Sequence, residues 1–592
     1  MQRDPALVTG ARWFPGGTLN YAEHALASRR AGHELAVVSS SDTRDPVTMT
    51  WDELRHLVAK LQAGLRLVGV EKGDVVAAYL PNIPETLALM LATTGLGAIW
   101  TCCAPEMGSV GVLDRLAQTN PVVFVAIDGY KYGSKSRDVR GAANVIRESL
   151  TTVRTSVMLS YLGDTDVDTP WHSWENLVDH DGPPHFEPVS FDHPLYILYS
   201  SGTTGKPKAI VHGHGGITLE HVKALHYHFD LDESDRFFWY STTGWMMWNF
   251  CVSGLLVDAT VCLYDGDPGW PSSTTLWRII DENEVTCAGV GASFLVANMK
   301  DGLIPGTTFA LKELVTLGVT GSALPPAAAK WIYRDVKPDL LINSFSGGTD
   351  VCTGIVGSSP LHPVIAGEIS CRCLGAKVEV FDDEGRPVID VEGELVVSAP
   401  LPSMPVGFLN DPEDRRYRAT YFEQYSGVWA HGDRATLTRR GTIVITGRSD
   451  GTLNRGGVRM GTAEFYSVVE DLEGIADSLV VHLEDRDGGP GEIWLFVVVN
   501  SSANVDDLTS RISSALRSQL SPRHVPDRIV VVPTIPRTAT GKKVEVPIKK
   551  ILSGADPASA VTLSALGDPD SLAPFLELAR TRFGEDSAPA SP

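Results

Sequence analysis

The chain has 592 residues, which is too many for one hydrophobic core, so at least two domains are expected. Hydrophobic residues make up 43% and charged residues 21%, an ordinary globular composition. The formal net charge of −22 argues against nucleic acid or an anionic membrane as a partner, because the overall field would repel both.

The eight cysteines form no CxxC pair, and most lie within apolar runs, as Cys262 does between Val261 and Leu263. This usage is typical of reduced core thiols in a cytosolic protein. The N-terminal sequence lacks a basic segment followed by an apolar one, so no signal peptide is predicted. The longest apolar-leaning stretch, Thr86–Trp100, is too short to span a bilayer. We therefore expect a cytoplasmic location.

Up to about residue 450, short apolar runs alternate with helical patterns, and Pro84–Ala98 is predicted to be a buried helix. Such alternation is typical of α/β layers with largely parallel sheets. The predicted strands are Val75–Leu80, Pro121–Ile127, Leu195–Tyr199, Arg236–Ser241, Thr260–Asp265 and Asp339–Ile342.

The pattern changes between Lys377 and Val397, where two β-rich runs flank the turn sequence DDEG at 382–385. These features predict a small antiparallel subdomain. A second boundary falls near residues 447–451, beyond which the chain is expected to form a separate α+β domain. Its predicted elements are the strands Glu492–Val499 and Arg528–Val532, an amphipathic helix over Val505–Leu520, and a final helix over Ser571–Arg582.

The strongest chemical signal is the run LYSSGTTGKPK from Leu198 to Lys208. Its glycines allow a backbone to approach a polyphosphate closely, and its hydroxyls, N–H groups and lysines offer donors and positive charge. A plain linker is disfavoured because the run lies between two apolar strands. A Walker P-loop is excluded, since no GxxxxGK[ST] spacing occurs here or at Gly541-Lys542.

This run resembles the signature of the acyl-adenylate-forming superfamily, which contains acyl-CoA synthetases, luciferases and adenylation domains. The resemblance covers about residues 12–550, and three further motifs resemble the branch that joins acetoacetate to coenzyme A. They are WYSTTGWMMWNF (239–250), SGGTDVCTG (346–354) and LNRGGVRMGTAE (453–464). The family fold implies a large N-terminal domain of layered α/β subdomains plus a small antiparallel β subdomain, at 1–449. A mobile C-terminal α+β domain would follow at 450–592, with a hinge at Asp450.

The resemblance implies an AMP-forming acetoacetate–CoA ligase that uses ATP, coenzyme A and Mg²⁺. A butyrate-like acid and a carrier-loading adenylation enzyme remain as alternatives within the superfamily. A catalytically silent acyl-nucleotide sensor is the alternative of a different class, and the intact Lys542, Asp433 and phosphate run argue against it.

By the same resemblance, Thr349 would donate to the α-phosphate, and Asp350, in place of the usual Glu, would help to hold Mg²⁺. Ser346 matches the position of an aromatic residue against adenine, and Phe345 beside it is the alternative source of that ring. Asp433 would bind the ribose hydroxyls. The remaining nucleotide- and CoA-binding set is Ser201, Gly202, Thr203, Thr204, Gly205, Lys206, Gly321, Ser322, Ala323, Ser344, Gly348, Arg448, Asn454, Gly457 and Arg459.

Lys542, in the run PRTATGK, matches the lysine that bridges the attacking carboxylate and the α-phosphate. The chemistry requires a cation there, because an anion attacks an anion and charge builds up on the phosphorus oxygens. The adjacent Lys543 is expected to be an ordinary surface lysine. The setting of Lys542 also resembles sites of regulatory acetylation, so a lysine acetyltransferase is a possible partner.

The acyl pocket implied by the resemblance is lined by Trp245, Met246, Met247, Thr320 and Gly347. Acetate-activating relatives carry a Trp at the position of Gly347, so glycine is expected to leave room for a longer acid. A buried oxo group would need a hydrogen-bond donor, and Thr320, His212 and the Trp248 N–H are the candidates. Trp239 is expected in the core, and His212 with His214 lacks a third metal ligand.

Overall fold

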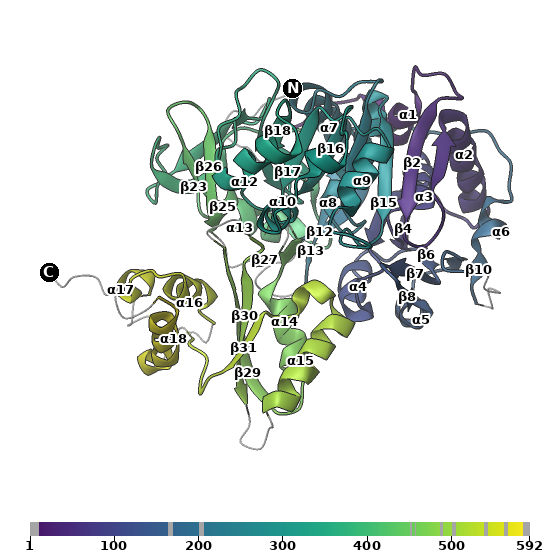
Figure 1. Ribbon diagram of the computed structural model, residues 1–592. Coiled ribbons are helices and arrows are strands. Elements are labelled where there is room, and N and C mark those ends of the chain that lie inside the picture. Colours follow the sequence, from purple (N-terminus) through teal and green to yellow (C-terminus); the bar gives the residue numbers. More distant parts are fainter. Residues whose placement is uncertain are drawn as a thin grey trace. The chain divides into compact units, whose positions relative to one another are not determined.

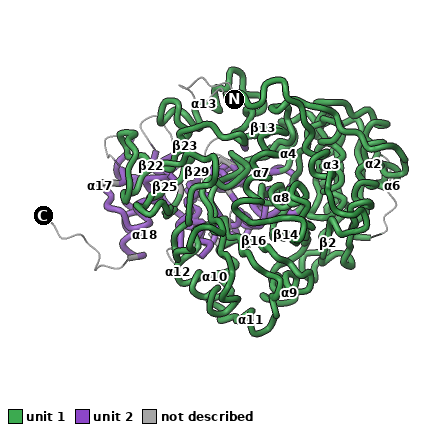
Figure 2. The backbone as a smooth tube through the Cα atoms, turned by 90° about the horizontal axis from the view of Figure 1, so that it is seen from above, with its two compact units in different colours: residues 1–105, 112–200, 208–447 green, residues 106–111, 201–207, 448–592 purple. Residues whose placement is uncertain are grey.

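The computed structural model describes residues 11–163, 170–200, 206–449, 453–455, 458–485, 489–499, 505–537, 543–561, 566 and 568–583. The chain divides into two compact units, which have separate colours in Figure 2. Unit 1 comprises residues 1–105, 112–200 and 208–447, and unit 2 comprises residues 106–111, 201–207 and 448–592. Among the described residues, no helix combines the length and the apolar character that crossing a membrane requires.

The first large sheet of unit 1 has eight strands, in the order β10-β9-β6-β4-β5-β12-β13-β24. It is parallel from β10 to β12, and β13 and β24 then pair antiparallel. All five residues of β4 and of β6 are buried, as expected for a parallel sheet covered on both faces. The strands are β4 (Val75–Tyr79), β5 (Ile99–Cys103), β6 (Val123–Ile127), β9 (Thr155–Leu159), β10 (His172–Ser173), β12 (Pro194–Ser200), β13 (Lys208–Gly213) and β24 (Gly407–Phe408).

The second large sheet has seven strands, in the order β18-β17-β16-β14-β15-β2-β3, and only β3 pairs antiparallel. The six strands predicted from the sequence before residue 377 all occur in these two sheets, with ends that agree to within a few residues. The predicted strand Thr260–Asp265 is reproduced without change. The strands are β2 (Leu35–Ser41), β3 (Val47–Thr50), β14 (Arg236–Trp239), β15 (Thr260–Asp265), β16 (Cys287–Gly291), β17 (Thr316–Thr320) and β18 (Leu341–Ser344).

Smaller sheets complete unit 1, and the four-stranded sheet β22-β23-β25-β26, in which β22, β23 and β25 pair antiparallel, confirms the predicted β subdomain. Its strands are β22 (Val378–Phe381), β23 (Glu392–Val397), β25 (Trp429–Leu437) and β26 (Ile443–Arg448). The other small-sheet strands are β1 (Thr18–Leu19), β7 (Gly129–Tyr132), β8 (Lys135–Asp138), β11 (Val189–Ser190), β19 (Ser346–Gly348), β20 (Thr353–Gly357) and β21 (Cys371–Arg372).

Helices pack around these sheets, and the predicted buried helix is confirmed as α3 (Pro84–Gly95). The other helices within residues 11–447 are α1 (Tyr21–Leu26), α2 (Trp51–Leu67), α4 (Ser109–Leu116), α5 (Arg140–Ser149), α6 (Trp174–Val178), α7 (His214–His228), α8 (Met246–Val252), α9 (Thr275–Glu282), α10 (Ala292–Lys300), α11 (Pro305–Thr308), α12 (Pro326–Trp331) and α13 (Arg415–Tyr421), with the short turns Ser253–Val257, Ile332–Val336 and Pro412–Asp414. All eight cysteines are buried, which confirms the prediction that they belong to the core.

Unit 2 is a sheet, β29-β30-β31, with helices on both faces (Figure 1). Because side chains alternate along a strand, Val480 and Leu495 pack with α14 and α15, while Val481 and Phe496 pack with α16 and α18. The elements are β27 (Leu453–Arg455), β28 (Val458–Met460), α14 (Thr462–Val469), β29 (Ile475–Leu483), β30 (Glu492–Val499), α15 (Val505–Gln519), β31 (Arg528–Val531), α16 (Glu545–Leu552), α17 (Pro557–Ala560) and α18 (Ala573–Phe583), with short turns at Pro522–His524 and Pro569–Leu572.

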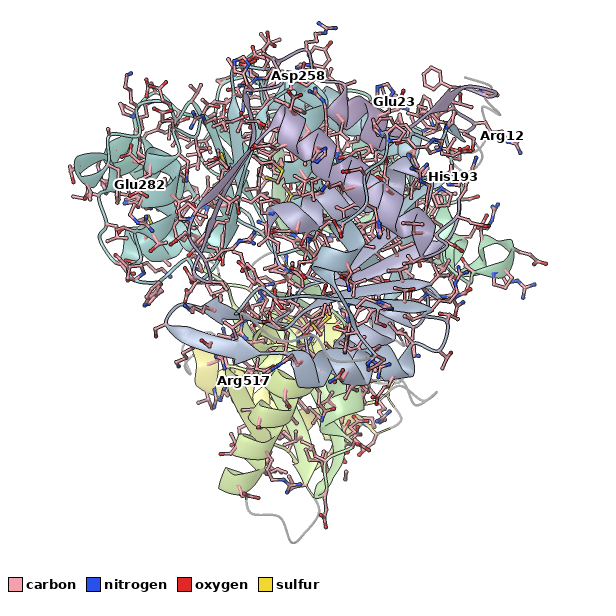
Figure 3. All side chains as sticks on the ribbon, turned by 90° about the vertical axis from the view of Figure 1, so that its right-hand side faces the viewer. Arg12, Glu23, His193, Asp258, Glu282 and Arg517 are labelled. Carbon is pink, nitrogen blue, oxygen red and sulfur yellow. The ribbon has the colours of Figure 1, made fainter. Side chains whose placement is uncertain are left out.

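Several histidines of unit 1 are buried in the neutral form. Burial lowers the pKa of His212 to about 4, of His214 to about 3 and of His221 to about 4. His214 accepts the backbone N–H of Tyr21 on Nδ1 at 3.1 Å, and its ring centroid lies 5.7 Å from that of His193, which is labelled in Figure 3. His212, His214 and His221 are therefore part of the core rather than of the titrating surface.

Acidification should destabilise the protein through these histidines. An unfolded histidine takes up a proton near pH 6.5, whereas the folded state resists protonation until a lower pH, so stability falls as the pH falls between the two values. At about pH 5 the expected loss for His214 is on the order of 2 kcal/mol. His214→Asn keeps an oxygen for the Tyr21 N–H and should reduce the fall in Tm between about pH 7.5 and pH 5. An equal fall in the wild type and in the variant would contradict this interpretation.

Candidate active site

Two predicted nucleotide-binding segments, Gly321–Ala323 and the motif at 346–354, meet at one edge of the seven-stranded sheet. β17 and β18 are parallel with Val319 opposite Ser344, so their carboxyl ends lie side by side. The segment Gly321–Ala323 follows β17, and β19 follows β18 almost directly. Gly321 has a φ of +92°, which favours glycine, and Ser322 and Ala323 are exposed. Parallel sheets bind ligands at this edge, so the predicted nucleotide segments share a plausible surface.

Phe345, the alternative source of the adenine-stacking ring, belongs to the core. Its side chain is only 6% exposed, and its ring packs against Phe229, Trp239 and Phe250 at centroid distances of 5.4, 5.4 and 6.0 Å. The proposal that Phe345 stacks on adenine is therefore wrong, because an aromatic cluster already covers the ring. The same cluster confirms Trp239 as a core residue. Ser346 is half-buried on β19.

Asp350 is a buried carboxylate that joins several elements of unit 1. Its side chain is 3% exposed, and Lys208 on β13 places Nζ 3.4 Å from Oδ1. The hydroxyl of Tyr421, the last residue of α13, donates to the same oxygen. The Lys208 ammonium also lies 5.3 Å from the Tyr421 ring centroid and 5.8 Å from that of Phe408. The strand that follows the phosphate run is thus tied directly to the SGGTDVCTG motif.

From Tyr421 the contacts continue to the predicted ribose-binding carboxylate. The Tyr421 ring stacks on Trp429 with centroids 3.6 Å apart and planes at 11°. The Trp429 Nε1–H donates to His431 Nδ1 at 3.3 Å, and His431 Nε2 lies 3.6 Å from Asp433 Oδ2. Trp429, His431 and Asp433 alternate along β25 and share one buried face. The structure therefore brings Asp350 and Asp433 into one connected network.

Two neutral histidines hold the backbone around Thr349 and Asp350. His212 Nε2–H donates to the Thr349 carbonyl oxygen at 2.9 Å, and His221 Nε2–H donates to that of Cys352 at 2.7 Å. His221 Nδ1 also bonds the hydroxyl of Ser253 at 2.7 Å. His212, which the sequence offered as a donor to an oxo group, instead fixes a peptide carbonyl of the neighbouring motif.

The predicted donors to an oxo group are all engaged within the protein. Thr320 Oγ1 donates to Phe345 O at 2.9 Å, and Trp248 Nε1–H donates to Asn82 Oδ1 at 2.9 Å. His212 donates to Thr349 as described above. A substrate oxo group would therefore have to displace one of these bonds or find another donor.

Asn249 offers an unassigned donor that sequence analysis missed. It lies on α8 with Met246 and Met247, and Trp245 is the half-buried N-cap of that helix. Residues three and four positions apart share a helix face, so Asn249 lies one turn beyond Trp245 and Met246 on the same side. Its side chain is buried, and neither amide atom has a hydrogen-bond partner within the described part of the chain. The signal in the sequence is a lone amide within the apolar run MMWNFCV.

Gly347 is required by a close approach of two backbones. It lies opposite Gly354 in the β19–β20 pair, and a Cβ at Gly347 would lie 1.9 Å from the carbonyl oxygen of Thr353. Any side chain would thus clash with the hairpin before reaching an acyl pocket. Gly347 was expected only to remove a wall of the acyl pocket. The structure corrects this expectation, because glycine is also the only residue that fits the observed backbone.

Several predicted site residues fall outside the described residues. They are Ser201, Gly202, Thr203, Thr204, Gly205, Asp450, Gly457 and Lys542. Arg448 ends β26 and Arg459 lies on β28 opposite Asn454, but the two arginine side chains are outside the described part. Asn454 is half-buried, and Lys206 is exposed just before β13.

Comparison with known proteins identifies the class. The model of the AMP-binding enzyme family matches residues 24–404, and that of the AMP-binding enzyme C-terminal domain matches residues 465–542. The chain therefore belongs to the AMP-binding enzyme family.

The relatives that match along most of this chain are described as acetoacetyl-CoA synthetases. The acetoacetyl-coenzyme A synthetase of Rhizobium meliloti (strain 1021) is 43% identical over 97% of this chain and 89% of its own length. The acetoacetyl-CoA synthetase of Gallus gallus is 38% identical over 92% of this chain and 83% of its own length. Among solved structures, the acetoacetyl-CoA synthetase from Streptomyces lividans matches with a TM-score of 0.75 and 46% identity, covering 97% of this chain and 88% of that chain.

Gly347→Ala should disturb the β19–β20 hairpin. The added carbon would overlap the Thr353 carbonyl, so the backbone must move, and we expect a loss of about 1–3 kcal/mol of stability and a lower Tm. Gly141→Ala on α5 is the matched control, since nothing lies within 4 Å of its added carbon and alanine favours a helix. Thermal unfolding of both variants checks the prediction, and equal Tm values would contradict it.

Proposed function

We propose that this protein is an AMP-forming acid–thiol ligase that joins acetoacetate to coenzyme A. The observation that carries the proposal is the near full-length similarity to acetoacetyl-CoA synthetases, at 46% identity over 97% of the chain for the solved relative. ATP and coenzyme A are the co-substrates. In the first step the acid carboxylate attacks the α-phosphorus of ATP, forming acetoacetyl-adenylate and releasing diphosphate. In the second step the thiolate of coenzyme A attacks the acyl carbonyl carbon, and AMP leaves.

In this proposal residues of both sequence domains bind and orient the nucleotide. Ser201–Lys206 hold the β- and γ-phosphates, Thr349 donates to the α-phosphate, and Asp433 accepts the ribose hydroxyls. The hydrogen bond from His212 to the Thr349 carbonyl supports this assignment, because it fixes the backbone that carries the donor. Gly321, Ser322, Ala323, Ser344, Ser346 and Gly348 form the adenine side, and Arg448, Asn454, Gly457 and Arg459 complete the set.

Mg²⁺ is the metal that this chemistry requires, and when bound it would neutralise charge on the phosphate oxygens. Within the described residues, no group of three or more His, Cys, Asp or Glu side chains is placed to hold a metal ion. This fits an ion held chiefly by the substrate phosphates, because Mg²⁺ commonly uses only one or two protein carboxylates in such sites. Asp350 is the buried carboxylate of the motif that would contribute.

We place the domain boundary between 449 and 450, with Asp450 as the hinge, and the enzyme in the cytoplasm. Lys542 supplies the cation between carboxylate and phosphate, and a lysine acetyltransferase acting on it would remove that charge and stop the first step. Stoichiometric acetylation of Lys542 in fully active protein, detected by mass spectrometry, would refute the regulatory part.

The amide of Asn249 is the donor that we assign to the oxo group of acetoacetate. An unpartnered buried amide costs about 1–3 kcal/mol, and a bound oxo group would recover part of that cost. Butyrate has the same chain length and no such oxygen, so it would leave the amide unpaired. A site of this kind favours the oxo acid strongly over its analogue.

Lys542→Ala should abolish adenylate formation and spare the second step. Loss of a transition-state donor typically lowers the rate about 10²–10³-fold, which ATP–diphosphate exchange measures. Thioester formation from supplied acetoacetyl-adenylate should stay within several-fold of the wild type. Lys550→Ala, which removes an exposed lysine from α16, is the control. Equal losses in both half-reactions would exclude the assigned role.

Asn249→Leu should lower the preference for acetoacetate without weakening the fold. The ratio of kcat/KM for acetoacetate to that for butyrate should fall about tenfold or more, while Tm stays level or rises, since an unpaired amide is replaced by an apolar group. Asn343→Leu is the stability control. The Asn343 amide donates to His228 O at 2.7 Å and accepts from Ser358 N at 3.1 Å, so its loss should lower Tm.

Three results would each overturn a different part of the proposal. An unchanged ratio in Asn249→Leu would remove Asn249 from oxo recognition. A wild-type preference for butyrate would overturn acetoacetate as the substrate and leave the ligase class standing. Acyl transfer to a carrier protein faster than to coenzyme A would favour the carrier-loading alternative.

A further inference from the structure

A single carboxylate in unit 2 receives the side chains on both sides of the segment 538–542. Arg537 Nη2 donates to Asp477 Oδ1 at 2.8 Å and to Oδ2 at 2.9 Å, and Nε lies 3.3 Å from Oδ2. Lys543 Nζ lies 3.2 Å from Asp477 Oδ1. The backbones of Arg537 and Lys543 also pair as an isolated antiparallel bridge. Arg537 and Lys543 are thus joined to each other through their backbones and through Asp477.

Lys543 is anchored rather than exposed. Its side chain is only 11% exposed, and Nζ donates to the Ser478 carbonyl oxygen at 2.6 Å and contacts the Glu470 carboxylate. The ammonium also lies 3.5 Å from the centroid of the Tyr466 ring. The expectation of an ordinary surface lysine is therefore wrong, because carboxylates, a carbonyl and an aromatic face surround its charge.

The anchoring partners lie on rigid elements. Asp477 and Ser478 belong to β29, while Tyr466 belongs to α14 and Glu470 is its C-cap residue. Glu470 Oε1 also accepts from the backbone N–H and the hydroxyl of Ser478, at 3.1 and 2.8 Å. Lys543 is therefore fixed to a strand and a helix that share one hydrophobic core.

We infer that Asp477 is a positioning residue for Lys542, through its contacts with Arg537 and Lys543. The inference rests on the proposed role of Lys542. Consecutive Cα atoms are about 3.8 Å apart, so anchoring Lys543 restricts where the Lys542 side chain begins. A catalytic cation must be placed within a fraction of an ångström, and a displacement of about 1 Å can cost roughly 10²-fold in rate. Asp477 touches no substrate in this scheme.

The test separates the two half-reactions in the full-length protein. Asp477→Asn should slow adenylate formation, measured by ATP–diphosphate exchange, by about 10- to 100-fold. Thioester formation from supplied acetoacetyl-adenylate should change less than about twofold, because that step does not use Lys542. Asp477→Glu, which keeps the carboxylate, should restore part of the lost rate. Glu484→Gln is the matched control, since it breaks a lysine–carboxylate pair of unit 2 with Lys549, away from the segment.

A double-mutant cycle tests whether Asp477 acts through Lys543. Asp477→Asn combined with Lys543→Met should slow adenylate formation little more than the slower single variant does, because both remove the same anchor. Additive losses would overturn this route. Equal slowing of both half-reactions, or slowing that follows a fall in Tm, would reduce Asp477 to a structural ion pair.

Lys542→Ala, assayed in parallel, separates this inference from the proposed function. If Lys542→Ala abolishes adenylate formation and Asp477→Asn leaves both rates unchanged, only the positioning role is overturned. If Lys542→Ala leaves adenylate formation intact, the assigned role of Lys542 and the inference built on it both fail.

Discussion

The burial of the Asp350 charge is the constraint on which the geometry of unit 1 depends. Removing a carboxylate from water costs several kcal/mol, and the structure offsets this with the ammonium of Lys208 and the hydroxyl of Tyr421. These partners come from β13 and from α13, which are far apart in the chain. One charge therefore fixes the strand after the phosphate run, the motif at 346–354 and the β subdomain that carries Asp433 relative to one another.

Neutral imidazoles complete this arrangement without adding charge. His212 and His221 each donate one N–H to a carbonyl of the segment 349–352, and burial lowers the pKa of both to about 4. A protonated imidazole at either position would compete with Lys208 for anionic groups. A neutral donor instead orients the peptide and leaves the local field to the lysine, which is the kind of preorganisation that binding an anion favours.

Alternation and motif order in the sequence were sufficient to predict the α/β layers, the antiparallel subdomain and the family. Details that depend on distant residues were not predictable in this way. Phe345 and Ser346 are neighbours in the chain, yet the Phe345 ring, between β18 and β19, is buried in an aromatic cluster, whereas Ser346 is half-buried on β19. The partners of Lys543 lie on β29 and at the end of α14, so no local pattern distinguishes it from a surface lysine.

The predicted acyl pocket also depends on contacts that could not be predicted from the sequence. Matching to relatives predicted that Gly347 enlarges the acyl pocket, because glycine has no side chain. The structure shows a different reason for glycine, since a Cβ at this position would lie 1.9 Å from the carbonyl oxygen of Thr353. Likewise Thr320 and Trp248 were predicted as donors from their residue types, and both hydrogen bonds are already used inside the protein. Asn249 stands out only when buried polar atoms are matched to their partners, because both atoms of its amide lack one within the described residues.

An apolar core packs on each face of the unit 2 sheet, and this packing limits where the domain can be truncated. The family model of the C-terminal domain ends at residue 542, but the core on one face of the sheet includes Ile548, Leu552 and Phe575 from α16 and α18. A fragment that stopped at that boundary would leave Trp494 and Phe496 uncovered on a broad apolar surface. Such a surface favours self-association, so the smallest fragment expected to stay monomeric extends through α18.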